Sequence, residues 1–133
     1  MLLKARSSRV REIPATVDYE MAEKTNFEIY RGAALVLRFQ LTTPEPYPTY
    51  VSGWTTRFTV KYEEGDANTI LSVAGSLATV PNALQYGIFD VFLSAADTAL
   101  LADKTFYDWS FKRTDSGSED VLALGEVRAF TTA

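Results

Sequence analysis

The residues that could do chemistry in this chain are carboxylates, because the sequence contains neither cysteine nor histidine. Their absence removes thiolate nucleophiles, disulfides, zinc–thiolate sites and the usual general base near neutral pH. Acid–base catalysis would then need two carboxylates within reach of one another. Asp90 is the only acid inside an otherwise apolar run, 86–93, and the alternation of that run turns its side chain away from the core. We therefore expect Asp90 to pair across strands with Lys or Arg, and we expect no enzymatic activity and no catalytic residue.

Oxygen ligands gather in one loop, residues 115–120, which holds three carboxylates and two serine hydroxyls. Ca²⁺ prefers such ligands, but the spacing does not match an EF-hand loop. Asp, Ser and Gly are also typical of hairpin turns for conformational reasons alone. The sequence contains no glycine-rich phosphate loop and no nucleophile elbow either. We expect a hairpin loop here, with no metal site and no cofactor.

The elements that must position these residues are short strands. From Thr25 onward, strand-forming residues recur with period two between turn signals about every ten to fifteen positions. Ser94 is placed to cap a single helical turn within 94–101. Parity predicts an inward-facing set with Trp54 and Trp109 at its centre: Phe27, Ile29, Leu35, Leu37, Phe39, Leu41, Trp54, Phe58, Val60, Tyr62, Phe89, Val91, Leu93, Tyr107, Trp109 and Phe111.

Seven or eight short antiparallel strands without a long helix predict an all-β fold, an immunoglobulin-like antiparallel β-sandwich, with a small jelly roll as the alternative. Residues 1–23 are polar, mixed in charge and without a sustained apolar period, so we expect an extended N-terminal arm there and the β-sandwich domain at 24–133. The longest uninterrupted aliphatic run, 33–37, is too short for a signal peptide or a membrane span. We expect a soluble protein that does not bind membranes.

The charge is unevenly distributed, which suggests a use for the arm. Residues 1–12 carry Lys4, Arg6, Arg9 and Arg11 against Glu12, a net charge of +3, while the rest carries nine basic and sixteen acidic side chains, a net charge of −7. A body this acidic argues against nucleic-acid binding, which needs a positive face. We expect the four basic residues to contact a neighbouring subunit; a disordered terminus is the alternative.

Surface aromatic residues are the second candidate for contact. The segment 42–50 has prolines at alternate positions, which favours a stiff polyproline-like loop that carries Tyr47 and Tyr50. These tyrosines are candidates for a protein interface or a sugar site, unless the loop is only a rigid link. Strand parity adds an outward-facing set, Tyr30, Tyr86, Phe92, Phe106 and Phe130. An outer aromatic surface is more typical of a protein interface than of a sugar site.

Five segments carry a family resemblance: 27–32 (FEIYRG), 51–58 (VSGWTTRF), 87–98 (GIFDVFLSAADT), 106–109 (FYDW) and 124–127 (LGEV). Together they resemble small immunoglobulin-like β-sandwich structural proteins of tailed bacteriophages. They are similar to the N-terminal domain of phage baseplate upper proteins, and a domain with a long arm is also like head decoration (cement) proteins. Val51 departs from the leucine of the family pattern, and the arm before Thr25 is longer than a baseplate domain would need.

This resemblance implies a non-enzymatic virion protein, either a capsid decoration protein, which we favour slightly, or a tail or baseplate component. Its expected partners are other virion proteins and further copies of itself, with neither nucleic acid nor membrane among them. Its expected location is the virion, and the host cytoplasm during assembly. The alternative from a different class is a carbohydrate-binding module that uses the surface aromatics and the Pro-rich loop.

Overall fold

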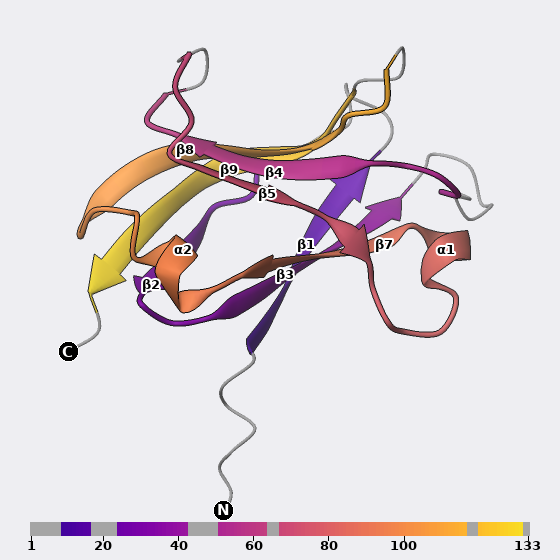
Figure 1. Ribbon diagram of the computed structural model, residues 1–133, viewed down its shortest axis with the longest axis horizontal. Coiled ribbons are helices and arrows are strands. Elements are labelled where there is room, and N and C mark those ends of the chain that lie inside the picture. The colour runs from indigo at the N-terminus through magenta and orange to yellow at the C-terminus, as the bar shows by residue number, and fades with distance from the viewer. Residues whose placement is uncertain (1–8, 17–23, 43–50, 64–66, 117–119, 132–133) are drawn as a thin grey trace, which may run out of the picture.

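The computed structural model describes residues 9–16, 24–42, 51–63, 67–116 and 120–131. Within these ranges the chain forms nine strands and two short helices (Figure 1). The elements are β1 (Arg9–Thr16), β2 (Phe27–Arg31), β3 (Leu35–Thr42), β4 (Thr56–Lys61), β5 (Leu71–Ala74), β6 (Ser76–Leu77), α1 (Ala83–Tyr86), β7 (Ile88–Leu93), α2 (Ala95–Thr98), β8 (Thr105–Arg113) and β9 (Asp120–Thr131).

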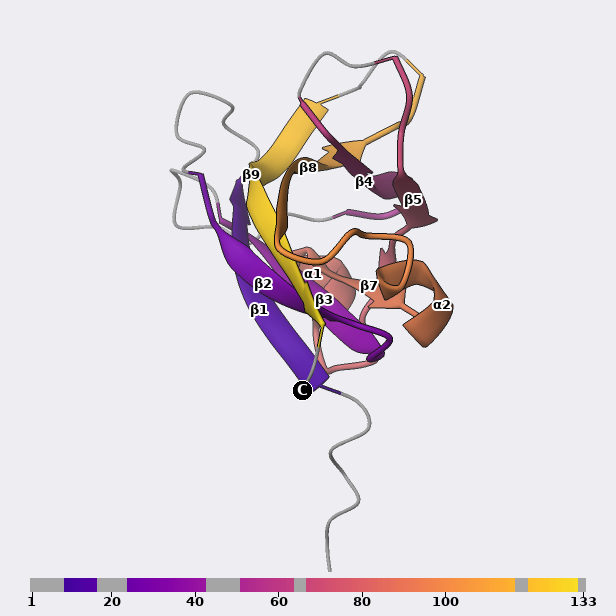
Figure 2. The same ribbon diagram turned by 90° about the vertical axis from the view of Figure 1, so that its left-hand side faces the viewer.

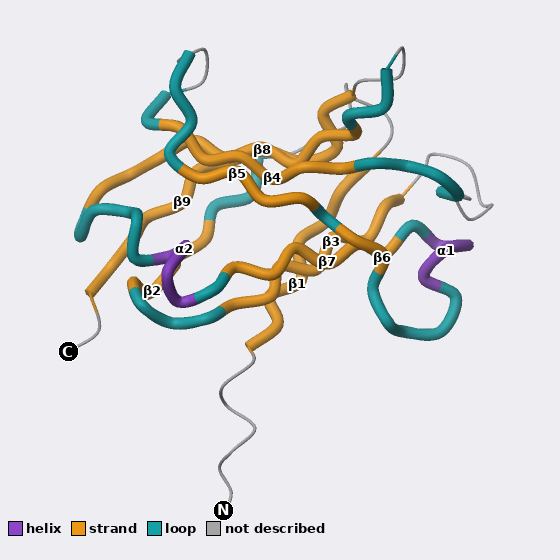
Figure 3. Tube along the Cα trace, viewed as in Figure 1, coloured by secondary structure: helices purple, strands orange, loops and turns teal. Residues whose placement is uncertain are grey.

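The strands make two sheets that pack face to face. One sheet has the order β1-β3-β7-β6 and the other the order β2-β9-β8-β4-β5 (Figure 3). The predicted β-sandwich is therefore confirmed. Both sheets are mixed rather than purely antiparallel, because β1 runs parallel to β3 and β2 runs parallel to β9, while the other described pairs are antiparallel.

Strand β1 corrects the expected boundary between arm and sandwich. It pairs with β3 along its whole length, and Ile13 and Ala15 are only 2% and 3% exposed. The expectation that the sandwich begins at residue 24 is therefore wrong for residues 9–16, while residues 1–8 and 17–23 lie outside the described residues. Only one face of this edge strand is buried and Pro14 is tolerated at an edge, so its sequence lacks a strong strand pattern.

The inner faces of both sheets form the core, largely as parity predicted. Trp54 and Tyr62 are the exceptions: Trp54 is half-buried at the rim, and Tyr62 is 58% exposed. Both residues lie outside β4, where strand alternation no longer applies. Leu35 is half-buried, and the other predicted residues are buried: Phe27, Ile29, Leu37, Phe39, Leu41, Phe58, Val60, Phe89, Val91, Leu93, Tyr107, Trp109 and Phe111.

The predicted helical turn is confirmed as α2. Ser94 accepts a hydrogen bond from the backbone N–H of Asp97 at 3.1 Å, and the Asp97 carboxylate accepts one from the N–H of Ser94 at 3.0 Å. The hydroxyl of Thr98, fully buried, accepts from the N–H of Gly32 at 2.9 Å and lies 3.1 Å from the carbonyl oxygen of Ala33. Through Thr98, α2 holds the turn between β2 and β3 in place.

The two long sides of the sandwich differ in how one sheet meets the other. On one side, β5 of one sheet leads directly through Gly75 into β6 of the other, so a single segment bridges both layers (Figure 3). On the opposite side, the sheets end in the edge strands β1 and β2, which lie side by side in Figure 2 and do not pair with each other. On this second side, the outer edges of β1 and β2 have no other described strand beside them.

Candidate interaction surface

Of the six residues that the sequence suggested for an interface, Arg11 is the one whose side chain the structure describes. It projects from β1, is exposed, and its guanidinium carbon lies 5.9 Å from the centre of the Phe27 ring. Arg9 begins the same strand. Lys4, Arg6, Tyr47 and Tyr50 lie outside the described residues, so their interface role and that of the Pro-rich loop stay predictions.

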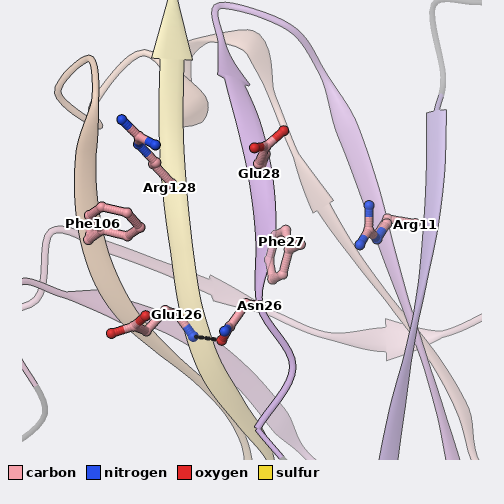
Figure 4. A pocket seen from close by; sticks show the side chains of 7 residues that line it. All are labelled: Arg11, Asn26, Phe27, Glu28, Phe106, Glu126 and Arg128. Atoms are coloured by element: carbon pink, nitrogen blue, oxygen red, sulfur yellow. Dashed lines mark hydrogen bonds between the residues drawn. The ribbon is translucent and has the colours of Figure 1, made fainter.

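Arg11 borders a cavity of about 380 Å³ that reaches from β1 across β2 to β9 and β8 (Figure 4). In Figure 4 the residues of β2 lie in the middle, Arg11 on one side, and Phe106, Glu126 and Arg128 on the other. The lining residues are Arg11, Asn26, Phe27, Glu28, Phe106, Glu126 and Arg128. Among the described residues, none of the four charged side chains of this cavity makes an ion pair.

Arg128 is held by aromatic rings. Its guanidinium carbon lies 4.9 Å from the ring centre of Phe106 and 4.7 Å from that of Phe130, and the Phe130 ring lies 6.3 Å from that of Tyr30. Glu28 is its register partner on β2 yet forms no ion pair with it. The Nε atom of Arg128 is buried and has no hydrogen-bond partner in the described part of the chain. We call Tyr30, Phe106, Arg128 and Phe130 the aromatic–arginine row.

The outward aromatic set is largely confirmed, and this row belongs to it. Phe92 and Phe106 are each 57% exposed, Tyr30 41% and Tyr86 40%, while Phe130 is half-buried. Sequence reasoning did not single out Arg128. The signal was available, because Arg128 and Phe130 have the same parity on one strand and so project from the same face.

A second cavity, of about 430 Å³, lies between the start of β1 and the free edge of β2. Val10 and Tyr30 border it and are 47% and 41% exposed. Both cavities include Arg11 and Glu28, so they adjoin at these two side chains beside β2. The lining residues of the second cavity are Val10, Arg11, Glu28, Tyr30, Ala33, Ala34 and Leu35.

Asp90 pairs across strands, as its position predicted. Its two carboxylate oxygens accept hydrogen bonds from Nε and Nη2 of Arg38 on β3, at 2.8 and 3.0 Å. The hydrogen bond to Asp90 raises the pKa of the Arg38 guanidinium above its ordinary value. This bidentate geometry is the strong form of an ion pair. Asp90 therefore serves to hold β7 to β3.

Asp115, in the loop that holds the oxygen ligands, is also engaged structurally. It accepts hydrogen bonds from Nε of Arg113 at 2.6 Å, from the hydroxyl of Thr55 at 2.9 Å and from the N–H of Thr55 at 3.1 Å. The bond from Arg113 is the main reason that the pKa of this carboxyl is lowered. Residues 117–119 lie outside the described residues. In the described part of the chain, no three acidic residues come close enough to hold a metal ion.

The fold is similar to that of known structures. The N-terminal domain of phage TP901-1 ORF48 superimposes with a TM-score of 0.54 at 10% sequence identity, covering 90% of this chain and 98% of that one. Auracyanin A, a "blue" copper protein from the green thermophilic photosynthetic bacterium Chloroflexus aurantiacus, superimposes with a TM-score of 0.44 at 16% identity, over 90% and 98% of the two chains.

No protein-family model and no curated protein sequence matches the chain. The comparisons therefore show a fold shared with a phage protein domain. In the described residues there is also no helix long and apolar enough to cross a membrane.

Proposed function

We propose that this chain is a non-enzymatic structural protein of a tailed-phage particle, in which the sandwich binds neighbouring subunits. The observation that carries the proposal is the aromatic–arginine row. Aromatic and arginine side chains are enriched at the centres of protein interfaces, and a guanidinium already stacked between rings loses little side-chain entropy on binding. Arg11, Glu28 and Glu126 lie beside the row and make no ion pair with a described residue, which suits a polar rim.

Two likenesses support the phage context. The fold resembles that of the N-terminal domain of phage TP901-1 ORF48 along nearly the full length of both chains. The sequence segments 27–32, 51–58 and 87–98 resemble the N-terminal domain of phage baseplate upper proteins. The sequence resemblance favours a place in the tail or baseplate, and capsid decoration is the alternative location. Partners would be other virion proteins and further copies of this chain, arranged by the symmetry of the particle.

Electron microscopy of labelled particles tests this function. An antibody raised against the purified chain would be applied to intact particles of the phage that encodes it, followed by a gold-conjugated second antibody. Gold at the tail or baseplate supports the proposal as stated, and gold on the head moves the protein to decoration. Purified particles that carry no gold, and no chain detectable by mass spectrometry, would refute a virion role.

The aromatic–arginine row can be tested in the same particles. Replacing Phe106 by Ala together with Arg128 by Gln removes one ring and the stacked cation from an exposed surface. We expect a folded protein that no longer enters particles. Lys112→Gln on the same strand as Phe106 is the matched control, because Lys112 is exposed and borders neither cavity. Incorporation of both variants at the wild-type level would show that the row is not the interface.

A carbohydrate-binding role is the second candidate, and one observation favours it. The smaller cavity brings an exposed ring, that of Phe106, together with two carboxylates and two guanidinium groups, which can hydrogen-bond sugar hydroxyls. A glycan array probed with the full chain tests this. A hit that is lost in Glu126→Gln would support a sugar site, and an array without hits would exclude it for the glycans displayed.

A further inference from the structure

The groove between β1 and β2 has the geometry of a vacant strand position. Each of these strands is the last of its sheet, so each has a row of backbone N–H and C=O groups with no described strand beside it. Such edges are templates for an added strand from another chain. The cavity of about 430 Å³ lies between these two edges, bordered by Val10 and Arg11 of β1 and by Glu28 and Tyr30 of β2.

The two sides of the groove differ in chemistry. The side toward the turn that joins β2 and β3 is apolar, with Ala33, Ala34 and Leu35, and Val10 adds an aliphatic side chain that is 47% exposed. Two exposed charged side chains also border the groove, Arg11 on the β1 side and Glu28 on the β2 side. Glu28 makes no ion pair with a described residue, because its register partner Arg128 stacks on rings instead. An occupant that fits along the edge of β2 should be an extended segment that is apolar on one face and carries basic side chains where it meets Glu28.

We propose that this groove binds residues 1–8 of a second copy of the chain, added as a strand along the free edge of β2. This segment reads Met-Leu-Leu-Lys-Ala-Arg-Ser-Ser. In an extended strand, alternate side chains face opposite ways, so Leu3 and Ala5 share one face and Lys4 and Arg6 share the other. The first pair meets the apolar side of the groove and the second pair meets Glu28. The inference rests on the proposed assembly function and names its partner.

The charges of the chain disfavour a hairpin between this segment and β1 of its own chain. To lie beside β1 of its own chain, the segment would have to reverse direction immediately before Arg9. With the two-residue turn Ser7-Ser8, Arg6 comes opposite Arg9 and Lys4 comes opposite Arg11 in an antiparallel hairpin. Like charges directly opposite each other destabilise a strand pair. A segment that arrives from another copy needs no reversal.

The experiment uses three measurements on the full chain and on a chain that begins at Arg9, which retains all of β1. Light scattering after size exclusion should show an oligomer for the full chain and a monomer for the shortened one. Isotope-labelled shortened chain is then titrated with a synthetic peptide of residues 1–8. Its backbone amide signals at residues 27–31 should shift in NMR spectra, and the thermal melt of the shortened chain shows whether it is folded.

Reversing the charge of Glu28 tests whether the basic residues of the peptide contact this side chain. Glu28→Lys in the shortened chain should weaken peptide binding about fivefold, the order expected when an exposed ion pair is replaced by repulsion. A peptide with Lys4→Glu and Arg6→Glu should bind this variant better than the natural peptide does. Asp120→Lys is the matched control, since Asp120 is exposed and borders neither cavity, and it should leave binding unchanged.

Three results would overturn the inference. They are a monomeric full chain, peptide binding that leaves residues 27–31 unshifted, and equal effects of Glu28→Lys and Asp120→Lys. In the first of these results, nuclear Overhauser effects at dilute concentration would show whether the segment contacts β2 of its own chain instead. None of these results affects the immunogold labelling of phage particles. The proposed function is therefore tested separately from this inference.

Discussion

The indole N–H of Trp109 donates a hydrogen bond to the backbone carbonyl of Thr25 at 3.1 Å, although the two residues are 84 positions apart. Trp109 is 2% exposed, and its ring centre lies 5.5 to 5.9 Å from those of Phe27, Phe39 and Phe58. The bond therefore ties the entry to β2 to the aromatic centre of the core. It satisfies the indole donor that burial of a tryptophan requires.

Trp109→Phe should lower the free energy of unfolding by about 2–4 kcal/mol, because it leaves a cavity and removes the hydrogen-bond donor to the Thr25 carbonyl. Urea denaturation followed by circular dichroism measures this. Trp54→Phe is the matched control, since Trp54 is half-buried and the smaller ring can still lie under the Arg113 guanidinium, now 4.1 Å away. Equal losses in the two variants would contradict the different roles assigned to these tryptophans.

Gly125→Ala should destabilise the protein by about 2 kcal/mol or more through overpacking. A Cβ atom at position 125 would lie 1.8 Å from the carbonyl oxygen of Thr25, so the backbone of one of the two segments must move. The same displacement would weaken the bond between Trp109 and Thr25. Differential scanning calorimetry should show a lower melting temperature, and an unchanged one would mean that the close approach of Thr25 to β9 is incorrect.

Thr98 and Thr56 are both buried, but we expect their valine variants to differ. The Thr98 hydroxyl accepts from the N–H of Gly32, so Thr98→Val should cost about 1–3 kcal/mol by leaving that donor without a partner. The Thr56 hydroxyl is buried without a hydrogen-bond partner among the described residues, so Thr56→Val should be neutral or stabilising. Urea midpoints of the two variants decide this, and the opposite order would disprove both assignments.

The stability of the protein should fall in acid partly because of Asp115 and Asp103. Hydrogen bonds lower the pKa of both carboxyls in the folded protein, from Arg113 to Asp115 and from the N–H of Thr131 to Asp103. The unfolded chain therefore binds these protons at a higher pH. The stabilisation is complete above the unfolded pKa, about 3.9, and is lost as the pH falls through the folded pKa.

Asp115→Asn and Asp103→Asn remove these titrations one at a time. Urea midpoints measured between pH 7 and pH 3 should fall less steeply in each variant than in the wild-type protein. Glu126→Gln is the control, because its side chain makes no hydrogen bond or ion pair in the described part of the chain. A wild-type slope retained in both Asp variants would show that other groups cause the acid sensitivity.

Local patterns in the sequence predicted the parts of the fold that depend on neighbouring residues. Alternation along 35–41 and 88–93 placed Leu37, Phe39 and Phe89 in the core and Asp90 outside, opposite a basic residue. Ser94 and the residues that follow it predicted the capped turn α2. These features could be read because strand parity and helix capping act within a few positions of the chain.

The candidate interaction surface was predicted less well than the fold. Outward parity identified Tyr30, Phe106 and Phe130, but it did not show that Arg128 stacks between two of these rings. Four of the six interface residues expected from composition lie outside the described residues. Charge and aromatic content suggest that a surface makes contacts, but they do not show which side chains from different strands come together.

By itself, the sequence determined the class of the protein: an all-β sandwich with no Cys or His chemistry, and a core whose members alternate along each strand. Only the tertiary structure decided that residues 9–16 are a strand, that β1 and β2 pair in parallel with β3 and β9, and that Gly125 must be a glycine. The reason is physical. A strand at a sheet edge and a glycine under a crossing backbone are specified by partners far away in the chain, and parity carries no information about those partners.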